Sequence, residues 1–169
     1  MPLFSRRPAL PDAYRQRLAL PRGDRALATV GLADGRWAVA TRLALYVLTD
    51  DAVERHPWLD VDRANLTAET MTITVHRVDG TSEDLPLTER GAETFARTLR
   101  ERVQASVVHS ESIALPGGRT VRVAVRHDED GSLFSQVVGD PTVDLEDPAV
   151  APLVDAAELR VRRAAGLRD

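Results

Sequence analysis

The sequence predicts an α+β fold that is mainly β: seven short strands capped by a helix, then a three-stranded meander and a closing helix. Strand-length apolar runs alternate with turn signals over 25–86 and again over 106–138. The apolar spacing changes to three and four over 88–104 and once more after Asp147-Pro148. A period of two is typical of half-buried strands, and a period near 3.6 is typical of amphipathic helices. The order of these periods predicts two blocks, each of strands followed by a helix.

The first block holds the seven expected strands. Asp34-Gly35 and Asp79-Gly80 predict tight hairpins, because both residue types tolerate the positive φ that such turns require. Met71, Ile73 and Val75 alternate with polar residues, so one face of their strand is expected to be buried. The strands are expected at 25–33, 36–41, 43–49, 53–58, 61–67, 71–76 and 81–86.

A helix is expected over 88–104, with Thr88 as its N-cap and Glu89 in its first turn. Its apolar face consists of Ala92, Phe95, Ala96, Leu99 and Val103. Seven strands can curl into two nearly orthogonal sheets, which leaves an open corner. We expect Phe95 and Leu99 to cover that corner.

The last third predicts a meander of strands at 106–115, 120–126 and 133–138. A closing helix follows Asp147-Pro148, which pairs a capping carboxylate with a proline at the first helical position. Its apolar stripe is Val150, Leu153, Val154, Ala157, Val161 and Ala164. The expected organisation is a basic leader with a short helix at 1–24, a barrel with its capping helix at 25–104, and an extension packed on the barrel at 105–169.

The composition excludes several kinds of functional site and indicates the kind of organism and compartment. The chain has 169 residues and no cysteine, which excludes disulfides, cysteine-ligated metals and thiol catalysis. All 22 basic residues are arginine, a bias that indicates a GC-rich bacterial genome. The leader over 1–25 carries six Arg and two Asp, and the rest carries 16 Arg and 24 acidic residues. No segment has the form of a signal peptide or a membrane span, so a cytoplasmic location is expected.

The strand region resembles the bacterial pleckstrin-homology-like domains. The resemblance rests on four stretches: Trp37-Ala-Val-Ala-Thr41, Leu43-Ala-Leu-Tyr-Val-Leu48, His56-Pro-Trp58 with Val61, and Met71-Thr-Ile-Thr-Val75 before Asp79-Gly80. It covers about 25–104 and implies a seven-stranded barrel capped by a helix. The whole chain also looks like an uncharacterised actinobacterial family that adds a C-terminal extension, and membership implies no known activity.

Eukaryotic relatives of such domains often bind phosphoinositides through basic residues around the first hairpin. In this chain that hairpin offers Arg36 beside Asp34. One cation next to one carboxylate is a poor phosphate clamp, so the resemblance does not carry lipid recognition over.

No motif predicts catalysis, a metal or a cofactor. The four histidines, His56, His76, His109 and His127, lack the close spacing of a metal site. Asp128-Glu-Asp-Gly131 is similar to the start of a calcium loop but has no bidentate Glu after it, so a hairpin turn is expected. Nucleophile elbows, P-loops and dinucleotide fingerprints are missing from the sequence.

These observations predict a non-enzymatic binding or scaffold protein whose partner is another protein, with no nucleic acid expected. Unpaired strand edges are the expected docking places. The candidate binding residues are Trp58, as an exposed aromatic anchor beside Pro57, together with Arg36, Arg6 and Arg7. The ordinary expectation for the large aromatics Trp37, Trp58 and Tyr46 is a place in the core or at the rim of the barrel, and the exposed Trp58 anchor is the alternative to it.

Two other functions stay open. One is attachment to an anionic membrane through the arginines of the leader, which are Arg6, Arg7, Arg15, Arg17 and Arg22. The other is a small hydrolase or isomerase with a cleft between barrel and extension, which would need two titratable groups in one pocket. The sequence does not determine the oligomeric state.

Overall fold

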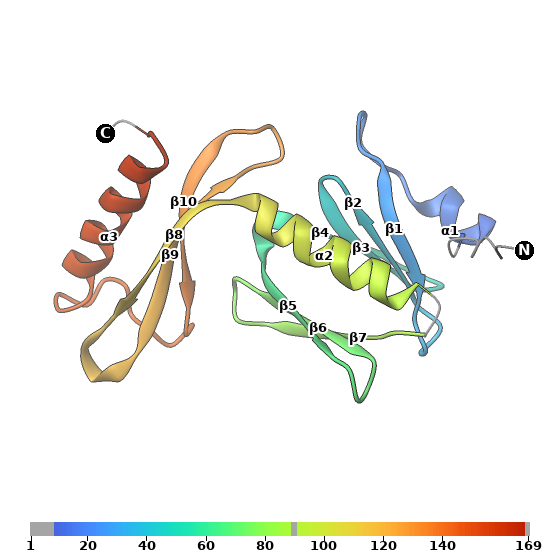
Figure 1. Cartoon of the computed structure of the whole chain (residues 1–169), viewed down its shortest axis with the longest axis horizontal. Coiled ribbons are helices and arrows are strands. Elements are labelled where there is room, and N and C mark those ends of the chain that lie inside the picture. Colours follow the sequence, from blue (N-terminus) through green and yellow to red (C-terminus); the bar gives the residue numbers. More distant parts are fainter. Residues whose placement is uncertain (1–8, 89–90, 168–169) are drawn as a thin grey trace, which may run out of the picture.

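A computed structural model describes residues 9–88 and 91–167 and has two lobes (Figure 1). The first lobe begins with α1 (Asp12–Arg17) and holds two antiparallel meanders. One sheet consists of β1 (Ala26–Gly31), β2 (Trp37–Thr41), β3 (Ala44–Leu48) and β4 (Val53–Pro57). A single 3-10 turn, η1 (Trp58–Asp60), leads to the other sheet of β5 (Val61–Thr67), β6 (Thr72–Arg77) and β7 (Ser82–Pro86).

The helix α2 (Ala92–Ser106) ends the first lobe and runs without a loop into the second lobe. The second lobe is a meander and a helix that covers one of its faces. Its elements are β8 (Val107–Ala114), the 3-10 turn η2 (Pro116–Gly118), β9 (Thr120–His127), β10 (Leu133–Gly139) and α3 (Ala151–Ala164). The predicted α+β class, mainly strands, is therefore confirmed.

The described strands form no closed barrel. The seven strands of the first lobe divide into a four-stranded and a three-stranded sheet, and an isolated bridge between Leu32 and Leu87 joins them. The chain turns through η1 between β4 and β5, so these two strands do not pair in register. The structure thus has the expected number and order of strands in this lobe without the barrel closure that the sequence predicts.

The main core lies between the two sheets and α2. Phe95 and Leu99 are fully buried there, as their spacing predicts. The start of the helix differs from the prediction: Gly91, with a φ of 84°, is its N-cap, and Thr88 instead donates its hydroxyl to the Gly31 carbonyl at 3.0 Å. Thr88 lies before the turn that begins the helix, so it fixes the end of β7 to β1 and does not cap α2. Glu89 lies outside the described residues.

The four-stranded sheet is also covered on its outer face. The leader places Leu10, Tyr14 and Leu18 against Tyr46 and neighbouring residues of that sheet, and the short helix expected in the leader is α1. The Tyr14 hydroxyl donates to an Asp50 carboxylate oxygen at 2.6 Å. Both faces of this sheet are therefore packed, which explains why β3 is buried along its whole length.

The second lobe has an apolar core of its own. Val121, Val123 and Val125 on one face of β9 pack against Val154 and Val161 of α3. This helix begins at Ala151, after a turn in which Asp147 accepts the backbone N–H of Ala149. No helix within the described residues is long and apolar enough to cross a membrane.

Candidate functional site

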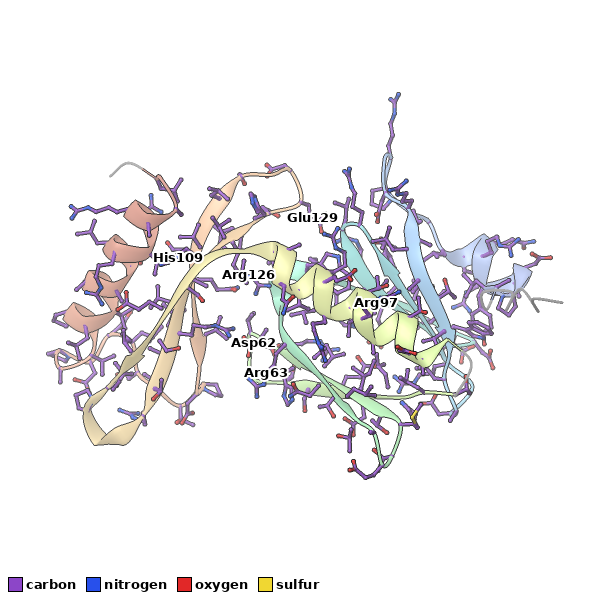
Figure 2. All side chains as sticks on the ribbon, viewed as in Figure 1. Asp62, Arg63, Arg97, His109, Arg126 and Glu129 are labelled. Atoms are coloured by element: carbon purple, nitrogen blue, oxygen red, sulfur yellow. The ribbon has the colours of Figure 1, made fainter. Side chains whose placement is uncertain are left out.

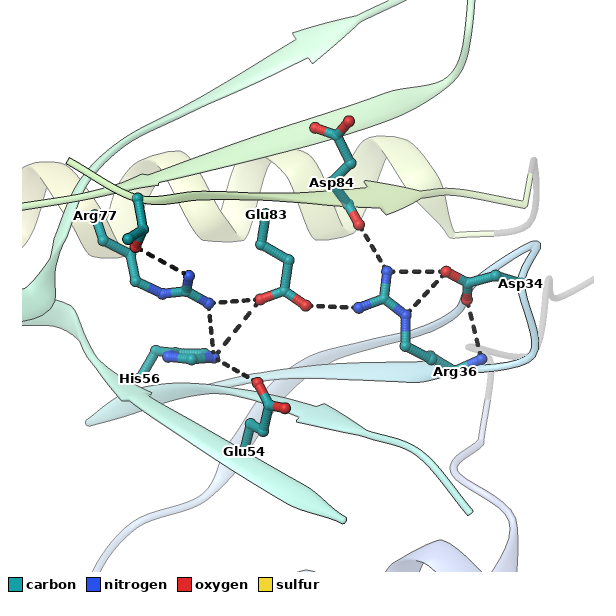
Figure 3. Close-up of polar contacts among 8 residues, drawn as sticks. Asp34, Arg36, Glu54, His56, Arg77, Glu83 and Asp84 are labelled. Carbon is teal, nitrogen blue, oxygen red and sulfur yellow. Dashed lines mark hydrogen bonds and ion pairs between the residues drawn. The ribbon is translucent and has the colours of Figure 1, made fainter. Parts of the chain in front are cut away.

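A cluster of charged side chains lies where the two sheets of the first lobe face one another (Figure 3). Glu83 on β7 accepts from Arg36 Nη1 at 2.5 Å and from Arg77 Nη2 at 2.6 Å. The same Arg77 nitrogen lies 3.2 Å from His56 Nε2, which is 3.7 Å from a carboxylate oxygen of Glu54. We call these five residues the inter-sheet cluster.

The strand geometry explains why these residues meet. Glu54 and His56 are two residues apart on β4, so their side chains share a face of the sheet. Glu83 on β7 pairs with Val75 of β6, two residues before Arg77 at the end of that strand. Arg36 ends the first hairpin and also donates to Asp34 at 2.9 Å and to the Asp84 carbonyl at 2.7 Å. The cluster therefore ties the first hairpin and β4 to the other sheet.

The cluster contains a set of potential metal ligands. One oxygen or nitrogen from each of Glu54, His56 and Glu83 lies within 4.8 Å of the others. The guanidinium of Arg77 already lies against two of the three groups. Burial and the charge of Arg77 also lower the pKa of His56, which favours the neutral imidazole. With two arginines neutralising Glu83, the arrangement is a protein-internal ion network and does not need a bound cation.

A buried arginine joins the two lobes. Arg126 on β9 is 1% exposed, and its guanidinium donates to the carbonyls of Trp58 at 2.6 Å, Leu59 at 2.9 Å and Val61 at 2.9 Å. It also donates to the Ser106 hydroxyl at 2.6 Å and to the Gln136 side chain at 3.1 Å. Figure 2 shows Arg126 between the meander of the second lobe and the end of α2.

Ionic contacts surround this joint. Asp62, which is 8% exposed, accepts hydrogen bonds from Arg122 of β9 and from its neighbour Arg63. Arg55 forms an ion pair with Glu129 of the β9–β10 turn at 2.5 Å. The hydrophobic clusters of the two lobes share no residue, so polar contacts make a large contribution to the joint.

A cavity of about 260 Å³ lies beside the joint. Its wall combines apolar and titratable side chains: Arg42, Leu43, Trp58, Leu59, Arg102, Ala105, Ser106, His127, Asp128, Glu129 and Gly131. Asp128 accepts the backbone N–H of Glu129, and Glu129 is paired with Arg55. The acidic groups of this cavity thus bind protein groups, and no hydrogen bond joins them to His127 in the part of the chain that the structure describes.

β8 forms an exposed edge of the second sheet. In the described residues β8 pairs with β9 and with no other strand, so the backbone groups on its outer side are unpaired. Val108, Ser110 and Ser112 are exposed along it. The other edge of this sheet, β10, is half-buried or buried from Leu133 to Val138. β8 is therefore the accessible edge of the second lobe.

The predicted binding residues are not brought together. Trp58 is 6% exposed and donates its indole N–H to the Thr41 carbonyl at 3.2 Å, so it is a core residue, as is ordinarily expected of the large aromatics, and the alternative of an exposed anchor is wrong. A Trp beside a Pro at a strand end is buried here because η1 turns it between the sheets. Arg36 is bound within the inter-sheet cluster. Arg6 and Arg7 lie outside the described residues.

Other sequence predictions are met locally. Asp130 accepts the backbone N–H of Ser132, and Gly131 has a φ of 85°, so 128–131 is the expected hairpin turn. His109 and His127 are exposed. Arg126 is not among the residues predicted from the sequence, although the alternation of β9 places Arg122 and Arg126 on the face opposite its valines. That pattern is the signal that a polar contact covers this face.

Comparisons with protein-family models, with curated proteins and with solved structures find no match for this chain. The pleckstrin-homology-like and actinobacterial resemblance therefore stays a prediction from the sequence.

Proposed function

We propose that the chain is a non-enzymatic binding protein that recognises another protein by adding a strand to the outer edge of β8. The observation that carries the proposal is the unpaired, exposed side of this eight-residue strand. An extended segment that pairs there gains main-chain hydrogen bonds along its length, and the neighbouring side chains select its sequence.

The charged groups of the first lobe support a binding role over an enzymatic one. A catalytic acid or base needs to reach a substrate with its proton-carrying atom. In the inter-sheet cluster both oxygens of Glu83 accept from arginines, and His56 contacts Arg77. In the cavity beside the joint, Glu129 is paired with Arg55. These carboxylates and this imidazole are therefore bound to other protein groups and stabilise the fold.

The arrangement of the first lobe supports a pleckstrin-homology-like domain as part of this proposal. Seven strands followed by a helix is the order that the resemblance implies, and here that helix packs on both sheets. The strand count and order agree with it, and the two sheets meet at one bridge. In this proposal the first lobe serves as the rigid base on which the second lobe displays β8.

Membrane attachment has less support. Two leader arginines are used internally: Arg15 contacts Asp12 at 2.9 Å and the Leu10 carbonyl, and Arg17 donates to the carbonyls of Thr49 and Asp50 at 2.7 Å. These contacts direct the charge toward the protein. No observation in the described residues favours this function over strand addition.

A library of random displayed peptides, selected on the immobilised full chain, tests the proposal. We expect selected peptides to bind the wild type and the control Thr67→Lys, which places a lysine on another exposed strand position, and to lose binding to Ser110→Lys. Peptides that bind Ser110→Lys as tightly as the wild type would refute recognition at β8, and so would a library that yields no binder for a chain that is monomeric in solution.

A further inference from the structure

From Ser110 onward, the edge of β8 has few of the features that usually prevent strand pairing. Natural edge strands are protected by lysine, proline, inward charges or bulges. β8 contains no lysine or proline, and its single acidic residue, Glu111, lies two positions from His109. A register shift occurs between Val107 and His109, at the beginning of the strand. From Ser110 onward the strand is regular and open on its outer side.

An apolar stripe of α3 borders this edge. Arg160 of α3 reaches across to Glu111 of β8, with Nη2 2.6 Å from Oε1. Leu153, Ala156 and Ala164 lie at helical spacing from Arg160 and so share its side of the helix. All three are exposed, and Leu153 is 43% exposed. The open strand edge therefore continues into an exposed row of apolar and small side chains.

The position of α3 suits one particular partner, a second copy of the same lobe. α3 packs mainly on β8 and β9 and less on β10, so it lies toward the β8 side of the sheet. If β8 pairs with β8 of a second copy around a two-fold axis, both α3 helices lie on one face of a six-stranded sheet. Because Arg160 of α3 reaches to Glu111 of β8, the helix sides that carry Leu153 and Ala156 then face one another across the axis.

Charge selects the register of such a pair. Two registers leave most of each strand paired: one has Ser110 on the axis, and the other has Glu111 there. The second places two glutamates directly opposite one another, which is destabilising. The first places Glu111 opposite His109 of the second copy, and does so twice because the contact is isologous.

We infer that two copies of this chain associate through antiparallel pairing of their β8 strands, with Ser110 facing Ser110 and the α3 helices packed through Leu153 and Ala156. The inference rests on the proposed function, because it names the partner that occupies the β8 edge. In this dimer the two meanders join through their β8 strands into one symmetric sheet of six strands, and the β8 edge is no longer exposed. The first lobes are carried on the opposite face of that sheet from α3.

The lack of cysteine gives a sharp test of this register. Residues directly opposite in an antiparallel pair have Cβ atoms about 5 Å apart, which suits a disulfide. We expect Ser110→Cys to form a disulfide-linked dimer of the full chain under mild oxidation. Ser112→Cys is the matched control: its two copies lie four residues apart along the strands, about 13 Å, and do not cross-link.

The mass in solution gives the second measurement. Sedimentation equilibrium of the full chain is expected to show twice the 18.5 kDa monomer mass at high protein concentration. Ser110→Lys and Leu153→Glu are expected to shift it to the monomer, and Thr67→Lys is expected to leave it unchanged. Circular dichroism of each variant confirms that it is folded.

The outcomes separate the two proposals. A wild type that is monomeric at every concentration, or a Ser112→Cys variant that cross-links as fast as Ser110→Cys, overturns the inference. If displayed peptides still bind β8 in that case, strand addition at this edge stands and the natural partner is another protein. If neither a dimer nor a peptide complex forms, both proposals fail together.

Discussion

Replacing Arg126 with methionine is expected to destabilise the protein strongly and to loosen the two lobes from one another. The change removes a guanidinium whose four terminal N–H groups serve five acceptors, three of them backbone carbonyls of 58–61 that are left without this donor. A hydrogen bond from a charged donor is worth about 1.5–3 kcal/mol, so the gross loss for four N–H groups is about 6–12 kcal/mol. Several kcal/mol of this loss are offset, because the variant no longer has to bury a charged guanidinium.

The net loss in the free energy of unfolding is therefore about 3–5 kcal/mol, the range seen when one partner of a buried charged network is removed. For a chain of this length that corresponds to a fall in Tm of roughly 10 °C. The stability of Arg126→Lys is expected to lie between those of the wild type and Arg126→Met, because an ammonium keeps the charge but reaches fewer of the five acceptors. Arg97→Met, at an exposed position on α2, is the matched control and is expected to change stability little.

Chemical denaturation followed by two signals measures this effect. Both tryptophans, Trp37 and Trp58, belong to the first lobe, so fluorescence reports that lobe, and far-ultraviolet circular dichroism reports both. The wild type is expected to show coincident transitions, and Arg126→Met to show separate ones. A loss of stability no larger than that of Arg97→Met, with coincident transitions, would refute the view that Arg126 holds the joint.

Three further changes have defined outcomes. Gly80→Ala places a Cβ 2.9 Å from the Pro141 ring at a φ of +85°, whereas Gly35→Ala has a similar φ in open space, so Gly80→Ala is expected to lower the urea midpoint more. Burial lowers the pKa of His56 in the folded state, so the unfolded state binds more protons below pH ~6.5. The free energy of unfolding is therefore expected to fall as the pH drops below that value. His56→Gln is expected to reduce the slope of this free energy against pH between pH ~7 and ~5.5. Arg77→Met is expected to destabilise the inter-sheet cluster and to leave the imidazole of His56 and the carboxylates of Glu54 and Glu83 free to bind Zn²⁺. Zinc is then expected to raise the Tm of this variant and to leave the Tm of the wild type unchanged.

The strands could be predicted because the signals that define them are local. Asp34-Gly35 and Asp79-Gly80 sit between runs of alternating residues, and each forms the turn of a hairpin in the structure. The start of α2 was harder to predict, since Thr88 has the chemistry of a cap but donates to a carbonyl 57 residues earlier in the chain. A competing long-range acceptor cannot be read from the spacing of neighbouring residues.

The polar sites depend still more on contacts between distant segments. Arg126 binds carbonyls that lie 65–68 residues earlier, and Glu83 joins two arginines from different sheets. Backbone carbonyls carry no side-chain signature, so the sequence gives no sign of where a buried guanidinium finds its acceptors. The burial of Trp58 agrees with the core position ordinarily expected of a large aromatic, and the turn η1 between the sheets places it there.

The openness of β8 follows from the path of the chain. α2 ends at Ser106 and β8 begins at Val107, so there is no intervening segment that could fold back over the edge. After β10 the chain passes to α3, which covers the face formed by the β9 valines. The opposite face is occupied by the joint at Arg126. Both faces of the second sheet are thereby covered within the chain, while the outer side of β8 pairs with no strand of the described residues, which is why the proposed strand addition is placed there.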